Sequence, residues 1–103
     1  METEKLIQNY SNILNNSEER LSNRFRALFS LKNLADQSED AISEMGKSFC
    51  DSSELLKHEI AYCLGQTKSQ KALKILEDVL NDHNQGDWRK IKIFERFFLL
   101  NFF

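Results

Sequence analysis

The chain has 103 residues, of which 41% are hydrophobic and 29% charged, as expected for one small globular domain. Its formal net charge is −2 and its basic residues are scattered, so we expect no binding to nucleic acid or to an anionic membrane surface. The absence of proline and the presence of only three glycines favour helices with short joints over a sheet rich in tight turns.

Apolar residues at helical spacing predict five helices separated by short polar breaks. The helices are predicted at about 2–15, 18–34, 39–49, 54–64 and 69–80. The first three breaks are NNS at 15–17, ADQS at 35–38 and DSS at 51–53. Serine side chains in the third break are expected to cap the fourth helix, and Gly65 is expected to end it in the left-handed conformation.

The helices repeat along the chain with a period near 33 residues. FRALFSL at 25–31 overlays HEIAYCL at 58–64, and Asp51 and Asp82 occupy matching joints. Such a period in an all-helical chain indicates an α-solenoid of stacked helical hairpins, here about two and a half repeats. The two arginines of RFRALF are expected at a solvated rim with packed stems.

Targeting signals and disulfide patterns are missing from the sequence. The N-terminus, METEKLIQNY, lacks the basic start and apolar core of a signal peptide, and no stretch approaches the roughly 20 apolar residues that span a bilayer. Cys50 and Cys63 do not form a CxxC pair, and both are expected to be buried free thiols. Together these features favour a cytoplasmic protein with no membrane partner.

The pair His58-Glu59 is the strongest candidate for chemistry. Imidazole and carboxylate ligands suit iron, manganese or zinc, but adjacent helical residues point about 100° apart and cannot chelate as a compact pair. From spacing alone, His58 can equally be a half-buried core histidine and Glu59 a solvated charge. His83 falls in a joint and is expected to be exposed.

Three stretches give the sequence a specific resemblance. RFRALFSL at 24–31, DAISEMGKSFCDSSELLKHE at 40–59 and LLKHEIAYCLGQ at 55–66 resemble the N-terminal part of the deoxyhypusine hydroxylases, over about residues 18–85. That resemblance implies an all-α solenoid of HEAT-like hairpins and O2-dependent hydroxylation of the deoxyhypusine residue of translation factor 5A. It also implies two Fe(2+) ions per full-length enzyme, held through four His-Glu motifs.

The resemblance assigns roles to three residues. His58 matches an iron-ligating histidine, and Glu59 matches a glutamate that ligates iron or binds the substrate amine. Gly65 matches the glycine at which the backbone comes close to the substrate. These matches imply that metal binding falls to His58 and Glu59, and substrate binding to Glu59 and Gly65.

The sequence then departs from the family. One repeat beyond His58 and Glu59 lie Ile91 and Lys92, where the family carries a second His-Glu pair. We therefore divide the chain into a HEAT-like segment at 1–85 and a divergent, aromatic-rich tail at 86–103. With one motif of four, the chain is expected to be a fragment that is inactive alone and retains no iron. A retained intron, a frameshift or an early-terminated gene model would give this pattern.

Two other hypotheses remain open. A short solenoid can act as a non-catalytic module that binds a protein such as the same translation factor. Alternatively, two chains could each contribute His58 and Glu59 to a metal site assembled in trans, although two motifs supply too few ligands for a di-iron centre.

Overall fold

The computed structural model describes residues 2–82, which form five α-helices and one 3-10 helix. These are α1 (Glu2–Leu14), α2 (Leu21–Leu34), α3 (Asp40–Gly46), the 3-10 helix η1 (Lys47–Cys50), α4 (Glu54–Thr67) and α5 (Gln70–Leu80). No strand occurs in this part of the chain. The predicted all-α fold is therefore confirmed. Two predictions lie outside the described residues, namely the aromatic-rich tail at 86–103 and an exposed His83.

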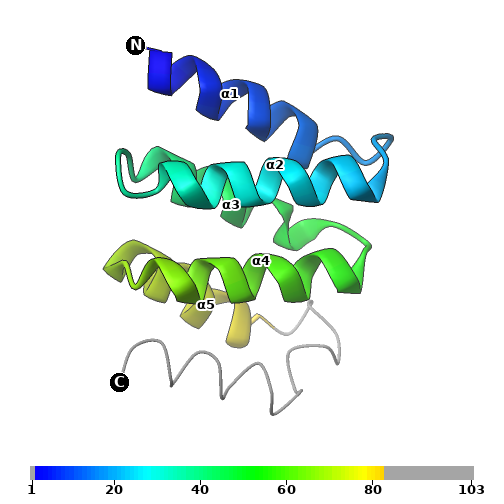
Figure 1. Cartoon of the computed structure of the whole chain (residues 1–103). Helices are drawn as coiled ribbons and strands as arrows, with labels where there is room; N and C mark the ends of the chain where they lie inside the picture. The colour runs from blue at the N-terminus through cyan, green and yellow to red at the C-terminus, as the bar shows by residue number, and fades with distance from the viewer. Residues whose placement is uncertain (1, 83–103) are drawn as a thin grey trace.

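Helix α1 is followed by two stacked hairpins, α2–α3 and α4–α5. Figure 1 shows α2 and α4 side by side in one layer, with α3 and α5 behind them. Contacts of α1 with both α2 and α3, and of α5 with both α3 and α4, place α1, α3 and α5 in the second layer. This two-layer stack is the α-solenoid that the repeat period predicts.

One continuous hydrophobic core fills the space between the layers, and every described helix contributes to it. Its largest fully buried side chains are Leu14, Leu28, Leu31, Ile42, Met45, Leu56, Ile60, Cys63, Leu64 and Leu76. Gly46 lets α3 and α5 approach closely, because a Cβ atom there would lie 3.1 Å from Cγ2 of Ile75. The core is shared between repeats, as expected for hairpins that cannot bury their own apolar faces.

Two predicted boundaries shift for local reasons. Helix α2 begins at Leu21 rather than near residue 18, because Asn16 forms a turn in which its Oδ1 atom accepts a hydrogen bond from the backbone N–H of Glu18 (3.0 Å). The third predicted helix changes from α to 3-10 after Gly46. Glycine is a poor helix former, and 3-10 turns are common at helix ends.

The end of α4 corrects the expectation for Gly65. Gly65 is buried inside α4, which continues to Thr67, and Lys68 is the residue in the left-handed conformation (φ 55°). Among residues 2–82, Lys68 alone combines a side chain with positive φ. The start of α4 agrees with the prediction, since the Ser53 side chain accepts a hydrogen bond from the backbone N–H of Leu56 (3.2 Å).

Candidate functional site

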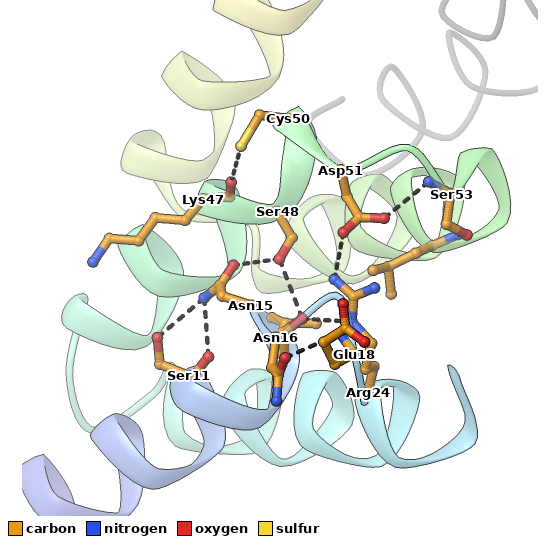
Figure 2. Close-up of polar contacts among 12 residues, drawn as sticks. Ser11, Asn15, Asn16, Glu18, Arg24, Lys47, Ser48, Cys50, Asp51 and Ser53 are labelled. Atoms are coloured by element: carbon orange, nitrogen blue, oxygen red, sulfur yellow. Dashed lines mark hydrogen bonds and ion pairs between the residues drawn. The ribbon is translucent and has the colours of Figure 1, made fainter. Parts of the chain in front are cut away.

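A buried ion pair fixes the start of α4, the helix that carries His58 and Glu59. Arg24 donates a hydrogen bond from Nη2 to Oδ2 of Asp51 (2.6 Å), and the Arg24 side chain is only 5% exposed. Its Nε atom donates to the carbonyl oxygen of Leu14 at the end of α1 (2.7 Å). Asp51 also accepts a hydrogen bond from the backbone N–H of Ser53 (2.9 Å), as Figure 2 shows. The end of α1, the start of α2 and the start of α4 are thereby joined.

This ion pair changes the acidity of Asp51. The hydrogen bond from Arg24 holds the pKa of the Asp51 carboxyl below its usual range, and the charges of Arg24 and Lys57 act in the same direction. Burial opposes this change but does not outweigh it. The expectation that both arginines of RFRALF lie at a solvated rim is therefore wrong for Arg24 and right for Arg26, which is exposed. Position 24 lies four and seven residues before the buried Leu28 and Leu31, so the helical spacing places it on the apolar face.

A second set of polar side chains joins α1 to α3 and η1. Ser11 is buried and donates a hydrogen bond from Oγ to Oε2 of Glu44 (3.0 Å). Asn15 donates to Ser11, and its Oδ1 atom accepts a hydrogen bond from Ser48, another buried side chain (Figure 2). Lys47 pairs with Glu44 at 2.6 Å. These contacts satisfy buried polar atoms between neighbouring elements, and they hold α1 against α3 and η1.

His58 and Glu59 lie in the second turn of α4, at the boundary between core and surface. Both are half-buried, whereas the flanking Leu56 and Ile60 are fully buried. The Nε2 atom of His58 is itself buried. The pair is therefore neither in the core nor fully solvated, which is compatible with both interpretations of the sequence.

Glu59 lies near a buried thiol. Burial, together with the negative charge of Glu59, raises the pKa of Cys63 to about 12, while the charge of Lys32 on α2 acts in the opposite direction. The prediction of a buried Cys63 is confirmed, whereas Cys50 is exposed at the last residue of η1, so its predicted burial is wrong. Cys63 is thus an unreactive core residue that lies between α2 and the candidate site.

The helices α2 and α4 place side chains outside the core at matching repeat positions. Arg26 and Phe29 occupy the repeat positions that Glu59 and Tyr62 occupy on α4. Phe29 is 44% exposed, and Leu55 at the start of α4 is 58% exposed. Tyr62 accepts a hydrogen bond from Nε2 of Gln66 (2.8 Å). We call these five residues, Arg26, Phe29, Leu55, Glu59 and Tyr62, the α2–α4 face.

The residues present do not fit a complete metal site. Within residues 2–82, no group of three or more histidine, cysteine, aspartate or glutamate side chains is placed to hold a metal ion. A 2-His-1-carboxylate iron site needs three protein ligands, and structural zinc needs four.

Within residues 2–82, no helix is long and apolar enough to cross a membrane.

Comparison with known proteins identifies the class first. Residues 7–92 match the family of HEAT repeats, and the chain belongs to that family. Among proteins of this class, the chain is similar to deoxyhypusine hydroxylases, at 48% identity over 85 residues to that of Drosophila melanogaster and 47% over 85 residues to that of Rattus norvegicus. Each match covers 82% of this chain and 28% of the relative.

A solved structure agrees with these sequence matches. Human deoxyhypusine hydroxylase, solved in complex with glycerol, superimposes with a TM-score of 0.80 at 40% identity. The superposition covers 87% of this chain and 31% of the human chain. The described part of the chain is thus a homologue of the N-terminal region of these enzymes, and the resemblance expected from the sequence is confirmed. The chain spans less than a third of the length of the relatives that it matches.

Proposed function

We propose that this chain provides the N-terminal part of a deoxyhypusine hydroxylase. The reaction is the O2-dependent hydroxylation of the deoxyhypusine residue of translation factor 5A to hypusine. The observation that carries the proposal is the sequence match of 47–48% identity, which extends over 82% of the chain. The structural match to the human enzyme, with a TM-score of 0.80, also supports it.

In this proposal His58 and Glu59 would be two of the ligands of Fe(2+), which would supply the activation of O2 once further ligands complete the site. Glu59 is also suited to hold the cationic amine of the deoxyhypusine side chain, because a carboxylate forms charge-assisted hydrogen bonds with an ammonium group. Gly65, which is buried in α4, is proposed to lie where backbone and substrate come close. The Arg24–Asp51 ion pair contributes by fixing where α4 starts, three residues after Asp51.

We further propose that the chain is cytoplasmic, because Cys50 and Cys63 are free thiols, which fit a reducing compartment. We also propose that it is inactive alone, because it contains one His-Glu pair. The family reaction needs three more pairs, and a metal centre with too few ligands is bound weakly. Without the other three His-Glu pairs the chain would lack a complete iron site, but it would keep its surface for translation factor 5A.

A chimeric enzyme tests the proposed function. Residues 1–82 replace the matched region of the rat enzyme, and hydroxylation of factor 5A that carries deoxyhypusine is followed by mass spectrometry. We expect the chimera to be active and its His58→Ala variant to lose activity. Cys50→Ser serves as the matched control, because Cys50 is exposed and lies outside the candidate site. A folded chimera without activity would contradict the proposal.

A second candidate function is a non-catalytic binding module. Phe29 and Leu55 are large apolar side chains exposed on the α2–α4 face, and exposed apolar groups that gather on one face are typical of interaction surfaces. This function predicts that the chain alone binds factor 5A in the presence of a metal chelator. Glu59→Ala should weaken that binding, whereas Glu77→Ala on the exposed surface of α5 should not. Equal binding by both variants would contradict it.

A further inference from the structure

We infer that His58 and Glu59 do not form a metal site within residues 2–82, and that any metal ion held through them needs ligands from outside this part of the chain. The choice of iron as the relevant metal rests on the proposed function. The shortage of ligands is independent of the proposed function, because it affects any divalent metal ion that takes nitrogen and oxygen ligands.

Geometry limits what the pair can do. His58 and Glu59 are consecutive residues of α4, so their side chains leave the helix about 100° apart. In the helical zinc motif His-Glu-x-x-His, by contrast, the two histidines are four residues apart and lie on one face. His58 and Glu59 therefore do not form a compact chelating pair on α4.

The nearest alternative ligands on α4 do not complete the site. Glu54 lies four residues before His58, on the same face, but together with Glu59 it does not form a three-ligand group. Cys63 lies four residues after Glu59 and is fully buried in the core. Two protein ligands remain at best, whereas catalytic zinc and iron sites use three.

Accessibility points to the same conclusion. The Nε2 atom of His58, one of the two nitrogens that can bind a metal ion, is buried. A solvated metal ion cannot reach that atom without movement of the surrounding side chains. A site that used Nε2 would therefore have to be built together with the segment that supplies the missing ligands.

Cobalt binding tests the inference on the complete chain of 103 residues. Co²⁺ is added anaerobically, the visible spectrum is recorded, and retained cobalt is measured after desalting. The variants are His58→Ala and its matched control His83→Ala, which changes the other histidine of the chain. Helical circular dichroism confirms that each variant is folded.

We expect the chain to show the spectrum of free Co²⁺ and to retain no more cobalt than a metal-free control protein. Stoichiometric retention that His58→Ala abolishes, and that survives combined replacement of His83, Asp87 and Glu95 by alanine, would overturn the inference, because no histidine, cysteine or acidic side chain beyond residue 82 would then be left to supply a ligand. His58-dependent retention that this combined replacement abolishes would support it. Retention of cobalt by the chimera, reduced by His58→Ala, would support the need for outside ligands.

The two proposals fail in different ways. Cobalt bound through His58 without any ligand from beyond residue 82 overturns the inference and leaves the proposed function intact. A folded but inactive chimera overturns the proposed function and leaves the inference intact, because the inference concerns the ligands available within residues 2–82.

Discussion

Replacing Arg24 by methionine tests whether the buried ion pair holds the hairpins together. Methionine keeps much of the volume of the side chain but removes the charge and every hydrogen-bond donor. Asp51, whose side chain is 11% exposed, is left with a poorly solvated carboxylate, and the carbonyl of Leu14 loses its donor. Removing one partner of a buried pair costs about 3–5 kcal/mol, so we expect the free energy of unfolding to fall by about 3 kcal/mol.

The control is Asp78→Asn, which breaks the ion pair between Lys74 and Asp78 on α5. Those side chains are 71% and 64% exposed, so solvent screens the interaction. Exposed pairs four residues apart contribute about 0.3–0.5 kcal/mol, and we expect a change of that size. Comparing the stability changes of the two variants shows how much of the cost comes from burial of the ion pair rather than from losing an ion pair as such.

Urea denaturation followed by circular dichroism measures both changes. With a slope of about 1 to 1.5 kcal/mol per M for a protein of this size, Arg24→Met should lower the midpoint by about 2 to 3 M at unchanged slope. The double variant Arg24→Met with Asp51→Leu should recover part of the loss, because no charge is then left buried. A cost for Arg24→Met no larger than that of Asp78→Asn would refute the reasoning.

Three further predictions concern single groups. The pKa of Asp51 is lower in the folded chain than in the unfolded chain, so its contribution to stability is complete above about pH 4 and is lost as pH falls through the lower folded pKa. Asp51→Asn should therefore flatten stability against pH in acid; an unchanged profile would exclude Asp51 as the cause. Cys50 should react with a thiol reagent at pH 8 in the folded chain, and Cys63 only after unfolding. Rapid reaction that persists in Cys50→Ser would contradict this. Lys68→Gly should raise stability by about 1 kcal/mol in thermal unfolding, because Lys68 has φ 55° and glycine adopts that conformation without strain. A lowered melting temperature would contradict that prediction.

The sequence predicts the helices better than it predicts their ends. Apolar spacing locates all five helices, because each helix buries one face in the shared core. The predicted end of α4 is wrong, because glycine is common at helix ends and the residue type alone points to Gly65. Gly65 is buried against the core, where a small side chain has its own packing reason, and Lys68 adopts the left-handed conformation instead.

Polar residues with distant partners are the harder part of the prediction. Helical spacing alone puts Arg24 on the apolar face of α2, but it does not show that Asp51, 27 residues later, supplies the charge that makes burial of Arg24 tolerable. The sequence predicts a buried free thiol at Cys50, but the change to 3-10 geometry after Gly46 alters which side chains face inward, and Cys50 is exposed. For His58, spacing could not choose between core and surface, and the structure places it between them.

The Arg24–Asp51 contact also explains why the candidate site depends on more than its own helix. In a solenoid each repeat contacts only its neighbours, so the orientation of α4 is set by α2 and α3 on one side and by α5 on the other. Asp51 fixes the turn that leads to Ser53, Ser53 caps α4, and His58 follows in its second turn. Small displacements at that turn would therefore move His58 and Glu59 together. Under the proposed function, a His-Glu pair held in this way would gain further ligands only if another segment is held with equal precision beside it, so metal binding through His58 and Glu59 would depend on that segment.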